Sequence, residues 1–147
     1  MTRRNAFMTT VAALLLGSAA ANADVVLDWN NIMVATVSGQ NPFSQARLAA
    51  ITQVAVFEAV NAVTGDYTPY LGTISAPPGS SAEAAAVAAA HTVLKNFFPA
   101  AAASLDAAQA NSLASIPDGP AKMNGIAVGE AAAAAMIAAR TNDGAAP

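Results

Sequence analysis

The sequence predicts an all-α protein, a helical bundle with about five helices in the mature chain. Alanine accounts for 41 of the 147 residues, and alanine favours the helix more strongly than any other residue. Apolar residues recur at steps of three and four in several segments, which is the spacing of one helix face. Prolines and glycines separate these segments, and no run alternates apolar and polar residues as a half-buried strand would.

Residues 1–23 are predicted to be a secretory signal peptide that is not part of the fold. Arg3 and Arg4 give it a positive start, residues 6–16 are mostly apolar, and Ala-Asn-Ala at 21–23 is a small-x-small cleavage site. The apolar stretch is shorter than the roughly 20 residues that a bilayer-spanning helix needs. We therefore expect an exported protein, periplasmic or extracellular, with its domain in residues 24–147.

The first helix is expected to begin at the polar run 28–31 and to end near Gly39, with Trp29 as its large apolar anchor. Asn41 and Pro42 are expected to begin the second helix, since proline is common in a first helical turn. The apolar face of this second helix continues to about Val63.

Residues 67–81 form a loop rich in proline and glycine, and its two tyrosines are expected to lie at the wet edge of a packed helix pair. Three further helices are expected at residues 81–98, 100–115 and 120–140. In the last of these, Gly125 and Gly129 are four residues apart and therefore share a face. Two glycines on one face allow a neighbouring backbone to approach closely.

Charge and composition exclude several classes of partner. The mature chain has 4 basic and 9 acidic residues, a net charge of −5, so it offers no electrostatic footprint for nucleic acid and no basic patch for anionic lipid. No later stretch has 18 uninterrupted apolar residues, so no membrane contact is expected after signal removal. The chain has no cysteine, and an alanine-rich core buries little area. A bundle of this kind is expected to be marginal alone, which suggests an incomplete domain.

The single histidine, His91, shares a helical stripe with Val87 and Leu94. This placement predicts a packed histidine that is bonded to a carbonyl or to a group on a neighbouring helix. A zinc site needs three or four ligands, and the chain has neither a second histidine nor a cysteine. We therefore expect no local metal site.

The carboxylates also favour structural roles. Asp24 and Asp28 suit a helix start, where negative charge stabilises the helix dipole. Glu58 and Asn61 are expected to be half-buried at a helix edge, with a buried network as the alternative. Arg47 lies eleven residues before Glu58 on the same helix, too far for a direct pair.

The four mature basic residues are scattered along the chain: Arg47, Lys95, Lys122 and Arg140. An anion pocket could use one or two of them, but no spacing indicates it. Nucleophile-elbow, phosphate-loop and dinucleotide motifs are all missing. The sequence therefore predicts no catalytic, cofactor-binding or metal-ligating residue in this chain.

Four segments in order carry a family resemblance. They read DVVLDWNNIMVATV, ARLAAITQVAVFEAVNAVTGDYTPYL, APPGSSAEAAAVAAAHTVLKNFFP and SLASIPDGPAKMNGIAVGEAAAAAMIAAR. Together they resemble the N-terminal half of exported bacterial proteins of the vanadium-dependent haloperoxidase type, in the type-2 phosphatidic-acid phosphatase superfamily. The resemblance covers residues 24–144 and implies an α-helical bundle.

The resemblance implies vanadate as the cofactor of the peroxidases, or phosphate as the substrate of the phosphatases, held in one anion pocket. The pocket motif lies in the C-terminal half of the family: a lysine seven residues before Arg-Pro, then Pro-Ser-Gly-His, then an arginine with a second histidine. Neither Lys95 nor Lys122 has Arg-Pro at that spacing, and His91 follows alanine. No family residue can therefore be assigned to a position of this chain.

The prediction is an N-terminal fragment of an exported vanadium-dependent haloperoxidase-like enzyme, which oxidises halide with peroxide, and a chain that is inactive alone. Its expected partner is the missing C-terminal half of the same domain, and a homo-oligomer stays open. The alternatives are a related acid phosphatase, which hydrolyses phosphomonoesters, and an exported non-catalytic helical binding or scaffold protein.

Overall fold

The computed structural model describes residues 19–145. It contains five α-helices and one short 3₁₀ turn, and no strand among these residues, so the all-α prediction is confirmed. The elements are α1 (Ala19–Val37), α2 (Pro42–Thr64), α3 (Ala82–Phe97), the 3₁₀ turn η1 (Pro99–Ala101), α4 (Ala102–Ala114) and α5 (Pro120–Ala139).

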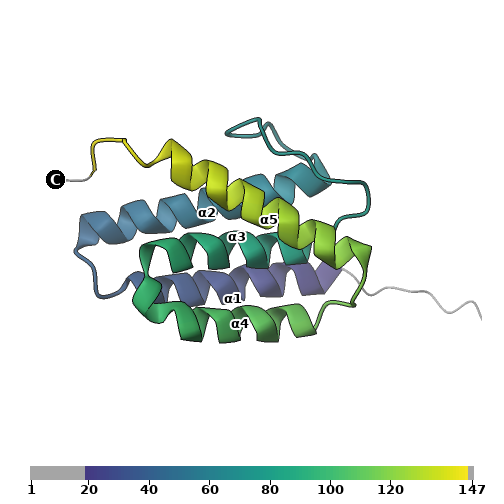
Figure 1. Cartoon of the computed structure of the whole chain (residues 1–147), viewed down its shortest axis with the longest axis horizontal. Helices are drawn as coiled ribbons and strands as arrows, with labels where there is room; N and C mark the ends of the chain where they lie inside the picture. Colours follow the sequence, from purple (N-terminus) through teal and green to yellow (C-terminus); the bar gives the residue numbers. More distant parts are fainter. Residues whose placement is uncertain (1–18, 146–147) are drawn as a thin grey trace, which may run out of the picture.

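Helix α3 is the centre of the bundle, and each of the other four helices packs against it (Figure 1). Every residue from Ala84 to Leu94 is buried except Thr92. A helix that is apolar on all sides is stable only when it is covered on all sides. The alanine run 84–90 meets this condition, because its short side chains let several helices approach at once.

The tightest approach is between α3 and α5, where the expected role of the two glycines is confirmed. A Cβ atom on Gly125 would lie 2.9 Å from the Ala84 Cβ, and one on Gly129 would lie 2.8 Å from the Ala88 Cβ. Real Cβ atoms essentially never come this close to a heavy atom. Only glycine therefore allows the observed separation of α3 and α5.

The helix starts expected for α2 and α3 are also confirmed. The Asn41 Oδ1 accepts hydrogen bonds from the backbone N–H groups of Phe43 and Ser44, each at 3.1 Å. The Ser81 Oγ accepts one from the Ala84 N–H at 3.1 Å. These bonds satisfy N–H groups that have no partner inside the helix.

The expected start of the first helix is wrong, because residues 28–31 lie in the middle of α1 rather than at its beginning. Trp29, Met33 and Val37 recur every four residues and are buried, while Asp28 lies on the exposed face. Asp28 and Asn31 thus lie on the exposed side of one continuous helix, with the buried Trp29 between them in the sequence. Residues 1–18 of the predicted signal peptide lie outside the described residues, and Ala19–Ala23 belong to α1. Export stays a prediction.

Helix α2 is the one described helix that is long and apolar enough to cross a membrane, with a mean hydropathy of 1.3 over its most apolar window. The core helix of a soluble protein passes the same test. Here α2 packs against α1, α3 and α5, and it carries the buried polar residues Glu58 and Asn61. These contacts explain its hydropathy as that of a bundle helix.

Candidate functional site

The structure brings together two arginines that are 93 residues apart in the sequence. Helices α2 and α5 run in opposite directions, so the start of α2 lies beside the end of α5 (Figure 1). The Arg47 Nη2 donates to both oxygens of the Asp143 carboxylate, at 3.0 and 3.1 Å, and to the Arg140 carbonyl oxygen at 3.1 Å. The four cations are scattered along the sequence and no spacing links these residues, but the fold brings the Arg47 side chain to the backbone at the end of α5.

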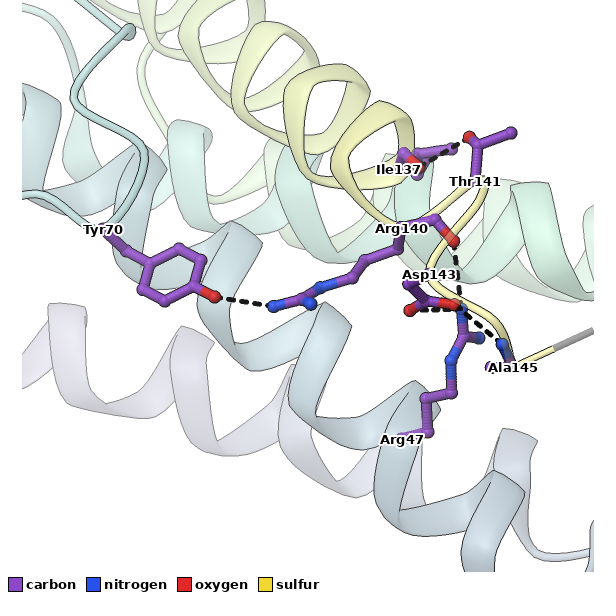
Figure 2. Close-up of polar contacts among 7 residues, drawn as sticks. All are labelled: Arg47, Tyr70, Ile137, Arg140, Thr141, Asp143 and Ala145. Carbon is purple, nitrogen blue, oxygen red and sulfur yellow. Dashed lines mark hydrogen bonds and ion pairs between the residues drawn. The ribbon is translucent and has the colours of Figure 1, made fainter.

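Arg140 itself points away from Asp143, along α2 toward the loop (Figure 2). Its Nη2 donates to the Tyr70 hydroxyl at 2.7 Å, and its guanidinium carbon lies 5.9 Å from the centre of the Tyr70 ring. We call Arg47, Tyr70, Arg140 and Asp143 the arginine cluster. It contains two positive charges and one negative charge in a chain that is acidic overall.

The carboxyl group of Asp143 is ionised at neutral pH. Burial raises its pKa, but the hydrogen bonds from the Arg47 side chain and the Ala145 N–H, together with the positive charges of Arg47 and Arg140, lower it more. The net pKa is below the ordinary value. The ion pair with Arg47 therefore holds the C-terminal turn against α2 over the whole neutral range.

Two hollows border the arginine cluster. The first, of about 240 Å³, lies between α2 and α5, and its apolar lining is Ala50, Ile51, Val54 and Met136. The second, of about 440 Å³, lies beside the ends of α3 and α5 and includes Asn96, Phe97 and Thr141. Arg47, Arg140 and Asp143 line both hollows.

The loop of residues 67–81, called here the tyrosine loop, is held by Glu58 and Asn61 of α2. Both residues were expected to be half-buried at a helix edge. That expectation is wrong, since Glu58 is 2% exposed and Asn61 is 6% exposed. The Asn61 side chain donates to the Tyr67 carbonyl and accepts from the Tyr67 N–H, each at 2.8 Å. The Glu58 carboxylate accepts a hydrogen bond from the Tyr70 N–H. The alternative of a buried network is correct, because the loop folds over these residues and supplies backbone groups that satisfy them.

His91 occupies the position expected of a packing residue. It is 7% exposed, and the edge of its ring meets the Trp29 ring at a centroid distance of 6.2 Å. Its Nε2 lies 2.7 Å from the Asp106 Oδ1 on α4, and the Lys95 Nζ donates to the same carboxylate at 2.7 and 2.9 Å. The expected bond to a neighbouring helix is therefore confirmed. The hydrogen bond from Lys95, followed by that with His91, holds the pKa of Asp106 below its ordinary value.

The remaining candidates are not brought together into a second site. Lys122 pairs with Asp118 at 2.9 Å within one turn of α5 and its preceding loop. Within residues 25–145, no three histidine, aspartate or glutamate side chains lie close enough to hold a metal ion. Nothing is described of the Asp24 side chain, and Asp28 is exposed on α1.

The arginine cluster is therefore the best candidate site for a ligand, and the His91–Asp106–Lys95 group ties α3 to α4. No protein-family model, curated protein or solved structure gives a significant match to this chain.

Proposed function

We propose that this chain forms the N-terminal helical part of an exported haloperoxidase-like domain and supplies its scaffold rather than its anion pocket. The order of the four sequence segments that resemble the family is the basis for this assignment. A related acid phosphatase would use the same scaffold. The observation that carries the scaffold role is an open, mainly apolar groove lined by α1, α2 and the start of the loop after α2.

This surface is a groove of about 280 Å³ with an apolar lining of Val26, Val56, Phe57, Val60 and Tyr67. Phe57 is 37% exposed and Tyr67 is 71% exposed, and their ring centres are 6.3 Å apart. Exposed apolar side chains of this kind are ones that another element can cover. Further helices of the same domain would bury them.

The described residues do not fit the vanadate site of the family. A trigonal oxyanion in that site needs a histidine together with several cations. His91 is bonded to Asp106 and packed between α1 and α4, whereas Arg47 and Arg140 meet at the ends of α2 and α5. His91 lines neither of the two hollows that Arg47 and Arg140 share, so the proposal assigns no catalytic step to this chain.

A second candidate, an exported non-catalytic binding protein, is favoured by the closed core. α3 is covered by four helices, and Arg47 Nε is the one buried side-chain nitrogen or oxygen without a hydrogen-bond partner in the described part of the chain. A core this well satisfied suits a bundle that folds on its own.

Two measurements separate these candidates. If the groove is open, the purified chain binds a hydrophobic dye, and Phe57→Ser lowers the dye fluorescence more than Met123→Ser, which changes an equally apolar exposed residue outside the groove. A compact monomer that melts cooperatively and binds no dye favours the binding protein instead.

The second measurement concerns activity and coding sequence. We expect no bromide oxidation by the purified chain with vanadate and peroxide, and measurable oxidation contradicts the scaffold role. Codons for Lys-x₆-Arg-Pro and Pro-Ser-Gly-His downstream of Pro147 support the haloperoxidase-like domain. A stop codon there, together with cooperative melting, contradicts it.

A further inference from the structure

Arg140 has no carboxylate partner, unlike the other cations of residues 25–145. Arg47 pairs with Asp143, Lys95 with Asp106 and Lys122 with Asp118. The one hydrogen bond of the Arg140 guanidinium in this part of the chain is to the neutral Tyr70 hydroxyl. A guanidinium carries five N–H donors, so Arg140 retains both its charge and most of its donors for a ligand.

This free charge stands beside an apolar hollow. In the 240 Å³ hollow between α2 and α5, Ala50, Ile51 and Val54 form one stripe along α2, and Met136 closes the other side. Ile51 and Met136 are almost fully buried and belong to the hydrophobic core. The hollow thus offers an apolar floor and a positively charged rim.

We propose that this hollow binds a small aliphatic carboxylate, with the carboxylate on Arg140 and the hydrocarbon tail along the Ala50–Ile51–Val54 stripe. The planar guanidinium fork matches a carboxylate in size and geometry, with two parallel N–H···O bonds. An inorganic anion would leave the apolar floor unused, and a neutral alcohol would leave the charge unused. The site does not depend on the proposed scaffold role.

Asp143 is the internal competitor for this ligand. Its carboxylate holds Arg47 at the same rim and reduces the positive charge that the ligand meets. Both of its oxygens use the same Nη2 donor, while the Arg47 Nε has no partner in the described residues. This contact lacks the side-on geometry of a full arginine–carboxylate pair. Removing the charge of Asp143 should therefore leave more positive charge at the rim for the ligand.

Titration of the full chain with octanoate, followed by calorimetry and by amide shifts in two-dimensional NMR, tests the proposal. We expect saturable binding with shifts confined to the facing parts of α2 and α5. Octanol lacks the carboxylate and acetate lacks the hydrocarbon tail, so each is expected to bind roughly tenfold more weakly or worse. The charged hydrogen bond that octanol cannot make is alone worth about this factor.

The variants distinguish the site from general adsorption. Arg140→Gln should weaken octanoate binding roughly tenfold, whereas Lys122→Gln, which removes the same charge elsewhere, should leave it unchanged. Asp143→Asn should strengthen binding, an outcome that loss of folding cannot produce. Equal affinity in the wild type and Arg140→Gln, equal affinity for octanol, or no saturable binding would overturn the proposal.

Discussion

Replacing Gly129 by alanine tests the close approach of α3 and α5, on which the bundle depends. The new Cβ would lie well inside 3.0 Å of the Ala85 carbonyl oxygen, 2.8 Å from the Ala88 Cβ and 2.9 Å from the Ala89 nitrogen. Two of these three atoms are backbone atoms inside α3 and cannot rotate away. Because ordinary contact begins at 3.4 Å, the helices must separate by at least about 0.6 Å.

The expected cost follows from two opposing effects. Overpacking of a well-packed core costs about 1–3 kcal/mol, and a clash with rigid backbone belongs at the upper end of that range. Alanine is better than glycine inside a helix by about 1 kcal/mol. The free energy of unfolding should therefore fall by about 2 kcal/mol, which lowers the melting temperature of a domain of this size by roughly 10 °C.

Thermal unfolding by far-UV circular dichroism and urea unfolding measure this change. Gly39→Ala is the matched control, since a Cβ there meets no atom within 4 Å and the backbone is not left-handed. It should be neutral or stabilise by about 0.4–1 kcal/mol. Gly125→Ala should resemble Gly129→Ala, and the double variant should cost less than the sum, because the first separation relieves the second clash. A Gly129→Ala protein as stable as the wild type would refute the reasoning.

Two further predictions concern a helix cap and an ion pair. Asn41→Ala removes the two hydrogen bonds that cap α2 and should lower the free energy of unfolding by about 1 kcal/mol, measured by urea unfolding with an unchanged slope; no loss would contradict the cap. Because the folded pKa of Asp106 lies below its ordinary value of 3.8, the pairing with Lys95 and His91 stabilises the fold fully above that value and is lost as the pH falls through the lower folded pKa. Asp106→Asn should therefore melt at a lower temperature than the wild type at neutral pH, and the two melting curves should converge in acid; a constant difference at all pH values would contradict this.

Local signals were enough to predict most of the helices. Asn41 with Pro42, and Ser81 with its following alanine run, are caps whose hydrogen bonds reach only two or three residues, so their geometry is encoded in short segments. The start of α1 was wrong because a short polar run has two meanings. It resembles a cap along the sequence, but it also occurs inside a helix whose Trp29, Met33 and Val37 are buried at four-residue steps.

Side-chain contacts between distant segments could not be predicted in the same way. Glu58 is buried only because the tyrosine loop returns over α2 and donates a backbone N–H to it. Arg47 and Arg140 are 93 residues apart, and they meet because α2 and α5 run in opposite directions. A single sequence carries no signal for such pairings, whereas the burial of His91 could be predicted from its stripe with Val87 and Leu94.

The alanine-rich centre also decides where a ligand site can lie. Alanine side chains let four helices close around α3, and the two glycines of α5 bring one of them to backbone contact. A bundle packed this tightly has little interior volume for a ligand. Hollows are instead found at the surface of the bundle, and two of them border α2, one against α1 and one against α5. A partner helix on the 280 Å³ groove beside α1 and a small carboxylate in the 240 Å³ hollow beside α5 would each use volume that the core cannot offer.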